Sequence, residues 1–116
     1  MTLSIDQTNG VTVIRLPQRL AMADVPATRR EMLRLVEQGH VNLVLDLTSV
    51  TFIDSSGLSV FVSAQEAARV AHGEVVLLNP SATARSLIEL TRLHEVFEIF
   101  GHEGHAVERL AVAQPA

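Results

Sequence analysis

The chain of 116 residues contains no cysteine, no tryptophan, no tyrosine and no lysine. Without cysteine it can form neither a disulfide nor a thiolate zinc site. Aromatic residues make up 3% of the chain, which is too few for the stacking platforms of single-strand binders. The nine basic residues, all arginine, form no basic stripe, and the net charge is -4. We therefore expect no nucleic-acid partner.

Long apolar runs are also absent, since none approaches the ~20 residues that a membrane span requires. The N-terminal segment MTLSIDQTNG lacks the basic, apolar and small-residue order of a secretory signal. We therefore expect a cytoplasmic protein with no membrane association. With 47% hydrophobic and 19% charged residues, the composition is typical of a globular protein. The length fits a single domain over residues 1–116.

The hydrophobic pattern changes period in a regular way along the chain. Residues 2–7 and 11–16 alternate on either side of Asn9-Gly10, a two-residue turn signal, and predict a hairpin. Further strands are predicted over 41–47, 74–78 and, as a short edge strand, 96–100. Helical spacing, with capping residues, glycine or proline at the ends, predicts helices over 24–38, 55–71, 81–93 and 103–113.

This order of elements predicts an α/β fold with a mixed, mostly parallel sheet, an N-terminal hairpin and about four helices. Sites in such sheets collect at the loops that leave the carboxyl ends of the strands. The segment 46–57 leaves the strand that we expect to be central, so it is the first candidate for a functional site.

Two serine hydroxyls stand in this segment, in the run Asp54-Ser55-Ser56-Gly57 that opens the second helix. The unpaired N–H groups and the positive dipole end of a helix stabilise an anion, so a phosphate on one serine would be well placed. The alternative is that Asp54 and Ser55 only cap the helix. Asp46 is either a carboxylate near this site or a strand-end residue that accepts hydrogen bonds from the loop.

Catalysis by the chain itself is not expected. The serine elbow of hydrolases, Gly-x-Ser-x-Gly, has no match here because Ile53 stands where the first glycine is required. No phosphate-loop or dinucleotide glycine motif occurs. The segment GHEGH at 101–105 lacks the histidine spacing of a zinc helix and has no third ligand at hand. We expect neither a metal nor a cofactor.

The stretch 46–100, DLTSVTFIDSSGLSVFVSAQEAARVAHGEVVLLNPSATARSLIELTRLHEVFEIF, resembles a STAS domain, in particular the bacterial anti-sigma factor antagonists. Their phosphoacceptor motif is Asp-Ser-Ser/Thr-Gly-Leu, and the resemblance extends over nearly the whole chain. It implies that Ser56, directly before Gly57, is phosphorylated by a partner that is both anti-sigma factor and serine kinase. It also implies that the unphosphorylated protein binds this partner and so releases a sigma factor, and that a serine phosphatase resets the switch.

The docking surface implied by the resemblance centres on the phosphoacceptor and the loop before it, beside the first helix. Its expected members are Ser56, Leu58, Ser59, Thr48, Ser49, Thr51 and Asp24, with Thr48 and Ser49 also fitting the role of turn formers. Family members usually carry a Gly-Arg/Glu-Leu-Asp-like segment before the first helix, with its Asp near the acceptor. Here Gln18-Arg19-Leu20-Ala21 replaces it, and Asp24 is a candidate substitute for the missing carboxylate.

Two other readings of the same residues stay open. The chain could be a STAS scaffold module in another signalling or transporter-associated complex, or a small enzyme or ligand-binding domain that uses the strand-end crevice for a nucleotide or lipid. For an anti-sigma factor antagonist we expect a monomer or a weak dimer.

Overall fold

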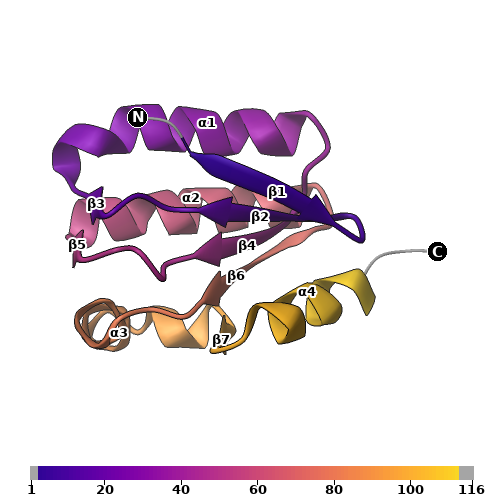
Figure 1. Cartoon of the computed structure of the whole chain (residues 1–116). Coiled ribbons are helices and arrows are strands. Elements are labelled where there is room, and N and C mark those ends of the chain that lie inside the picture. The colour runs from indigo at the N-terminus through magenta and orange to yellow at the C-terminus, as the bar shows by residue number, and fades with distance from the viewer. Residues whose placement is uncertain (1–2, 113–116) are drawn as a thin grey trace.

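The computed structural model describes residues 3–112, in which one sheet is sandwiched between helices (Figure 1). The elements, in chain order, are β1 (Ser4–Thr8), β2 (Val11–Arg15), β3 (Arg19–Leu20), the 3₁₀ turn η1 (Met22–Asp24), α1 (Val25–Glu37), β4 (Asn42–Asp46), β5 (Phe52–Ile53), α2 (Ser55–Val70), β6 (Glu74–Leu78), α3 (Ala82–Leu90), the 3₁₀ turn η2 (Leu93–Glu95), β7 (Ile99–Phe100) and α4 (Glu103–Val112). The predicted α/β class, mixed sheet and four helices are confirmed.

The main sheet has the strand order β1-β2-β4-β6-β7, with β1 antiparallel to β2 and all other pairs parallel. The β1–β2 hairpin turns at Asn9 and Gly10, whose φ angles are 53° and 76°. Positive φ at both central residues is what a type I′ hairpin turn requires. The predicted hairpin is therefore confirmed from Ser4 onward, while Thr2 lies outside the described residues.

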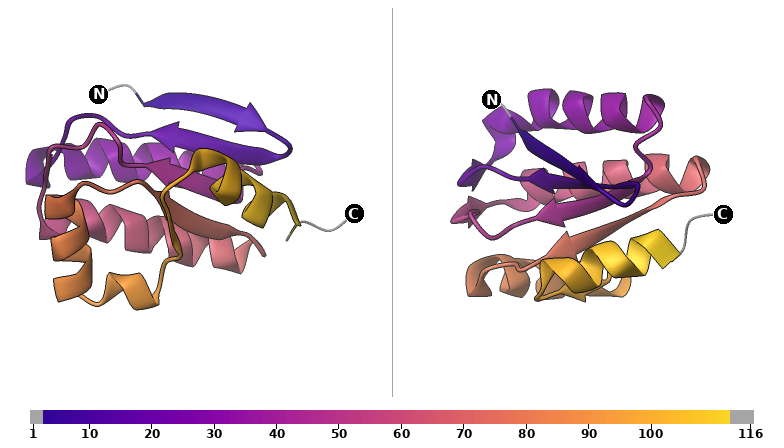
Figure 2. Two further views of the ribbon diagram at one scale, coloured as in Figure 1. Left: turned by 60° about the horizontal axis from the view of Figure 1, so that its bottom comes forward. Right: turned by 45° about the vertical axis from the view of Figure 1, so that its right-hand side comes forward.

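The two faces of the sheet bury different helices (Figure 2). Leu43 and Leu45 of β4 belong to a large apolar cluster with α1, α2 and α3. Val44, which points to the opposite face, packs with Val107 and Leu110 of α4. The central strand β4 is thus covered on both sides, as its run of Val and Leu predicted.

Several predicted boundaries of helices and strands were wrong. The third helix ends at Leu90 rather than at residue 93, because Arg92 takes a left-handed conformation with φ 61° and the chain turns into η2. The last strand pairs only through Ile99–Phe100. At the end of α2 the left-handed residue is His72, with φ 66°, and not Gly73. Gly73 has another role, since a Cβ there would lie 2.0 Å from the Val41 carbonyl oxygen.

The sequence did not predict the two-stranded parallel sheet β3–β5, in which Arg19 pairs with Phe52 and Leu20 with Ile53. The Gln18 carbonyl also accepts hydrogen bonds from the Thr51 and Phe52 N–H groups, at 2.8 and 3.1 Å. This small sheet holds the segment before α1 against the loop that leads into α2, so it forms the surroundings of Ser56.

Within the described residues, no helix combines the length and the apolar character needed to span a bilayer.

Candidate functional site

Asp54 fixes the start of α2 with both of its carboxylate oxygens. Its backbone is extended, and Oδ1 accepts a hydrogen bond from the Gly57 N–H at 2.9 Å, which caps the helix. Oδ2 accepts a second hydrogen bond from the Met22 N–H of η1 at 3.2 Å. Asp54 therefore satisfies one unpaired donor of α2 and ties η1 to the helix N-terminus. The predicted capping role of Asp54 is confirmed, whereas Ser55 is the first residue of α2 and does not cap it.

The two candidate serines occupy the first turn of α2, where the helix dipole favours a negative charge. Ser55 is exposed and Ser56 is half-buried. The Ser56 carbonyl accepts a hydrogen bond from the Ser59 hydroxyl, one turn further along. A phosphate on Ser56 would therefore stand at the positive end of a sixteen-residue helix, beside η1. That Ser56 is the acceptor stays a prediction.

Gly57 lets the first turn of α2 approach the small sheet closely. A Cβ at this position would lie 2.5 Å from the Leu20 carbonyl oxygen and 3.0 Å from Ile53 Cγ1. Real Cβ atoms do not make the first contact, so any other side chain would push α2 away from β3–β5. The glycine that follows the two serines is thus explained by packing.

The structure corrects the expectation for Leu58. Its side chain is only 2% exposed and belongs to the core under α2. Leu58 shares its helix face with Phe61, which is fully buried, because residues three apart lie side by side on a helix. Leu58 therefore cannot contact a partner directly. Ser59, in contrast, is half-buried and accepts a hydrogen bond from Arg29 of α1 at 2.9 Å.

The loop between β4 and β5 exposes Thr48, Ser49 and Thr51, buries Leu47 and Val50, and is held by hydrogen bonds. Thr48 and Ser49 form a turn, as predicted from their residue types. The Thr48 hydroxyl donates to Asp46 and accepts from the Asn79 side chain at 3.1 Å. The exposed Thr51 is anchored by its bonds to the Gln18 carbonyl. This loop is thus a fixed surface.

Asp46 does not lie on the Ser56 side of the sheet. It follows Val44 at a spacing of two, so its side chain points to the face that α4 covers, whereas α2 covers the other face. Burial raises the pKa of Asp46, but hydrogen bonds from Thr48 and the Arg15 guanidinium at 2.8 Å outweigh it, and the pKa lies below its usual range. The expected proximity to the phosphate site was wrong, and the alternative turn-bonding role is the one observed.

Asp24 does not replace the missing family carboxylate at the acceptor. Its Oδ2 accepts a hydrogen bond from the Ala21 N–H at 3.1 Å and so closes the η1 turn. The Ala21 side chain is 6% exposed and faces the core. Asp24 is half-buried at the start of α1, next to the candidate surface, but its carboxylate is bonded to the backbone of its own turn.

Sequence reasoning missed two exposed apolar side chains beside the acceptor. Met22 is 70% exposed and Phe52 is 44% exposed, and the Arg19 guanidinium lies 4.6 Å from the centre of the Phe52 ring. Met22 lies in η1, and its N–H donates to the Asp54 carboxylate. Phe52 lies two residues before Asp54 in the chain. In the structure Ile53 is buried and its strand neighbour Phe52 points to the opposite side, but a strand of two residues is too short for the sequence to show this alternation.

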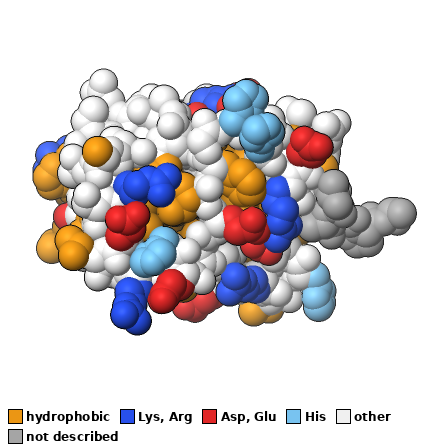
Figure 3. Space-filling view, turned by 90° about the horizontal axis from the view of Figure 1, so that it is seen from below, with side chains coloured by type: hydrophobic (Ala, Val, Ile, Leu, Met, Phe, Trp, Pro, Cys, Tyr) orange, Lys and Arg blue, Asp and Glu red, His pale blue; other side chains and the backbone are white. Residues whose placement is uncertain are grey.

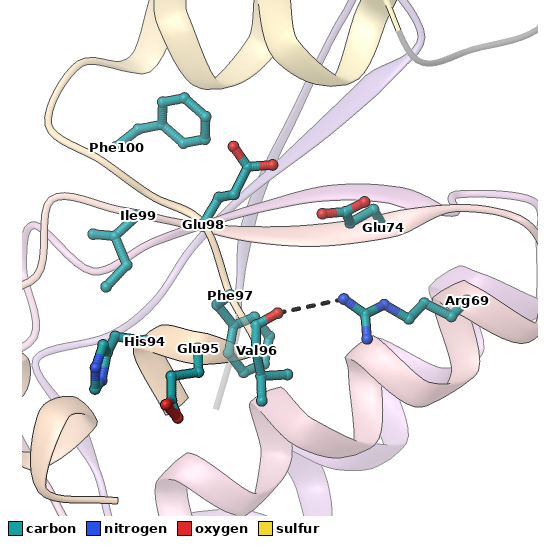
Figure 4. A pocket seen from close by; sticks show the side chains of 9 residues that line it. All are labelled: Arg69, Glu74, His94, Glu95, Val96, Phe97, Glu98, Ile99 and Phe100. Atoms are coloured by element: carbon teal, nitrogen blue, oxygen red, sulfur yellow. Dashed lines mark hydrogen bonds between the residues drawn. The ribbon is translucent and has the colours of Figure 1, made fainter. Parts of the chain in front are cut away.

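An open pocket of about 460 Å³ lies at the other end of α2, below β7 (Figure 4). Three of its charged side chains, those of Arg69, Glu74 and Glu98, already have partners. Arg109 contacts Glu98 at 2.9 Å and Glu74 at 3.5 Å, and Arg69 donates to a backbone carbonyl before β7. Arg69 is thirteen residues from Ser56, or roughly 20 Å along the helix. The pocket is thus separate from the candidate site.

The face formed by α3, β7 and α4 carries blue and red side chains interleaved, with no continuous basic field (Figure 3). In the part of the chain that the structure describes, no group of three or more His, Cys, Asp or Glu side chains is placed to hold a metal ion.

Comparison with known proteins decides the family. The family model described as STAS domain matches residues 2–106. The chain belongs to the STAS domain family. Among curated relatives, this STAS domain is 42% identical over 69 residues to the anti-sigma-B factor antagonist of Listeria monocytogenes, a match that spans 60% of each chain. It is 27% identical over 101 residues to the anti-sigma-B factor antagonist of Bacillus subtilis, covering 85% of this chain and 92% of that protein.

Solved structures share the fold. The anti-sigma factor antagonist SpoIIAA in its unphosphorylated form superimposes with a TM-score of 0.81 at 24% identity, covering 93% of this chain and 95% of that one. The phosphorylated form of Bacillus SpoIIAA gives a TM-score of 0.73 at 24% identity, with 93% and 98% covered. The murine anion transporter Slc26a9 gives 0.75 at 19% identity, and the similar part is 19% of that chain.

Proposed function

We propose that the chain, as a single STAS domain over residues 1–116, is an anti-sigma factor antagonist switched by phosphorylation of Ser56. Unphosphorylated, it binds a partner that is both anti-sigma factor and serine kinase, and a sigma factor is released. The kinase transfers a phosphoryl group from ATP to Ser56 Oγ, with loss of the hydroxyl proton and release of ADP, and the complex separates. A serine phosphatase restores the hydroxyl. The domain itself binds and does not catalyse.

The observation that carries this proposal is the position of Ser56 in the first turn of α2, next to exposed apolar side chains. Met22, whose N–H binds Asp54, and Phe52, two residues before Asp54 in the chain, are both exposed. Exposed apolar side chains next to a modifiable group suit a surface that docks a protein. The hydroxyls of the 48–51 loop and Ser59 complete the polar rim that we propose for it.

Phosphorylation would block docking by charge, without unfolding the domain. A phosphoserine adds close to two negative charges and three acceptor oxygens. Within the domain, the N-terminus of α2 stabilises this charge. Against an apolar partner surface the same charge must lose its water, which is costly. The supporting relatives are named antagonists of anti-sigma factors, and the phosphorylated SpoIIAA shows that a chain of this fold carries the modification.

The experiment uses a purified candidate serine kinase from the same organism, with radiolabelled ATP and wild type, Ser56→Ala and Ser55→Ala. We expect label on wild type and Ser55→Ala and none on Ser56→Ala. Titration calorimetry should then show Ser56→Ala bound to the kinase as tightly as wild type, and Ser56→Asp bound roughly a hundredfold more weakly. Melting followed by circular dichroism should show Ser56→Asp folded and stabilised by about 0.3–1 kcal/mol.

Label retained on Ser56→Ala, or equal binding of Ser56→Asp, would overturn the switch. The second candidate would then gain weight, namely a STAS scaffold in a larger complex. The murine transporter favours it, because there a similar domain is a small part of a longer chain. A domain that bound the labelled nucleotide without any kinase would instead be a ligand-binding module. Sedimentation of the free protein would test the expected monomer or weak dimer.

A further inference from the structure

Arg29 of α1 is held between the two helices by neutral groups only. Its Nη2 donates to the Ser59 hydroxyl at 2.9 Å, and its Nε donates to the Ser63 hydroxyl at 3.2 Å. Among residues 3–112, no carboxylate forms a salt bridge with this half-buried guanidinium. A positive charge that is partly removed from water therefore has two hydroxyls as its acceptors, although a charged acceptor would bind it more strongly.

The guanidinium lies one helical turn from the predicted phosphoacceptor. Ser59 follows Ser56 by three residues, and side chains at this spacing are neighbours, with Cβ atoms about 5–6 Å apart. The Ser59 hydroxyl that accepts from Arg29 also donates to the Ser56 carbonyl. α1 and α2 pack side by side and run in the same direction (Figure 1). Helical side chains lean toward the N-terminus of their own helix, so the Arg29 side chain, which reaches Ser59 and Ser63 of α2, leans toward the end of the pair that carries Ser56.

We propose that Arg29 is the domain's own partner for a phosphate on Ser56, and this inference rests on the proposed function. When Ser56 is phosphorylated, the guanidinium exchanges the hydroxyls of Ser59 and Ser63 for two phosphate oxygens. Arginine suits this exchange because its planar fork binds phosphate through two parallel hydrogen bonds. The phosphate is drawn over the seam between α1 and α2.

The other charged groups around Ser56 leave this role to Arg29. The Asp54 and Asp24 carboxylates would repel a phosphate, and both already accept hydrogen bonds from backbone N–H groups. The Arg19 guanidinium lies over the Phe52 ring on the small sheet. A phosphate on Ser56 that points away from Asp54, along the face of α2, lies next to Ser59. It therefore also lies next to the Arg29 guanidinium, which donates to the Ser59 hydroxyl.

The test installs phosphoserine at position 56 by genetic code expansion, so it needs neither the kinase nor the partner. Phosphorus NMR follows the second ionisation of the phosphate in wild type, Arg29→Gln, Arg29→Lys and Arg30→Gln. Arg30 is the matched control, because it is the next residue of α1 and is exposed. Phosphoserine ionises near pH 6, and we expect a midpoint about one pH unit lower in wild type and Arg30→Gln than in Arg29→Gln. Arg29→Lys should fall between them.

Equal midpoints in all four proteins would overturn the proposal. A purely structural Arg29 would lower the melting temperature of phosphorylated and unphosphorylated protein alike and leave the midpoint in place. If Arg29→Gln failed to fold, the Arg29 Nε–H resonance of the wild-type protein would decide, since it should shift on phosphorylation and an unchanged resonance would refute the contact. Failure of the proposed function shows up separately, as absent kinase labelling or unimpaired binding of Ser56→Asp.

Discussion

Replacing Gly57 by alanine tests whether close packing of α2 on the small sheet requires glycine. The new Cβ would lie 2.5 Å from the Leu20 carbonyl oxygen, a backbone atom that cannot swing aside. Overpacking of this kind costs about 1–3 kcal/mol. Alanine recovers up to ~1 kcal/mol through its better helix propensity. Because the clash is with a backbone atom, we expect a cost of about 2–3 kcal/mol, and after the propensity gain a net loss of about 1–2 kcal/mol.

Gly104→Ala in α4 is the matched control. Its Cβ would meet the His102 ring at 3.3 Å, and this ring belongs to an exposed side chain that can move. The propensity gain should then dominate, so this variant should be neutral or more stable by up to ~1 kcal/mol. Both glycines lie in the first turn of a helix, so the comparison isolates the contact with Leu20.

The assay is urea unfolding followed by circular dichroism at about 222 nm, the helix band, because the chain has no Trp or Tyr to report. Thermal melting should show Gly57→Ala lower by several degrees, since 1 kcal/mol shifts the melting temperature of a small domain by roughly 4 °C. Equal stability of Gly57→Ala and Gly104→Ala would refute the packing argument and would mean that α2 can shift without loss.

Three further predictions concern the cap, the exposed apolar pair and the buried carboxylate. Asp54→Ala should lose about 1–2 kcal/mol in urea unfolding, because the Gly57 and Met22 N–H groups lose their acceptor, and a loss below ~0.5 kcal/mol would contradict this. The double variant Met22→Ser with Phe52→Ser should keep the free energy of unfolding within ~0.5 kcal/mol of wild type but weaken kinase binding at least tenfold by calorimetry. Unchanged binding would show that neither residue belongs to the docking surface. The pKa of Asp46 is lowered by folding, so its ionised form stabilises the protein above its usual pKa of 3.8, and that stabilisation is lost as pH falls through the folded value. The stability gap between wild type and Asp46→Asn should therefore be full at about pH 7 and shrink below about pH 4, whereas a constant gap would contradict the shift.

Local signals in the sequence were sufficient for most elements of the fold. Asn9-Gly10 specifies its hairpin turn through two positive φ angles, and the unbroken apolar run 43–45 identifies a strand covered on both faces. Asp54 was identifiable as a cap because its side chain serves the helix that directly follows it. Each of these depends on residues close together in sequence.

The parts that escaped prediction depend on contacts between distant segments. The β3–β5 sheet has two residues per strand, too few to show a period, and it forms only because Gln18 reaches the 51–52 backbone. The role of Gly73 was set in the same way, by the backbone of Val41, which is 32 residues away in the sequence. Asp24 differs, because its carboxylate accepts a hydrogen bond from the Ala21 N–H within the same turn. The burial of Leu58, in contrast, was readable from its spacing to Phe61.

The replacement of the family's usual aspartate by Ala21 bears directly on the phosphorylated state. The resemblance implies that an aspartate at this position would add a negative charge near a phosphate on the acceptor. Here Ala21 faces the core, and the Asp24 carboxylate is bound to the Ala21 N–H, so Asp54 is the nearby carboxylate that remains. Fewer negative charges around Ser56, with the Arg29 guanidinium one turn away, favour an anion there. The substitution would thus stabilise the phosphorylated form of this domain, and the partner that separates from it would need to recognise a site without the aspartate.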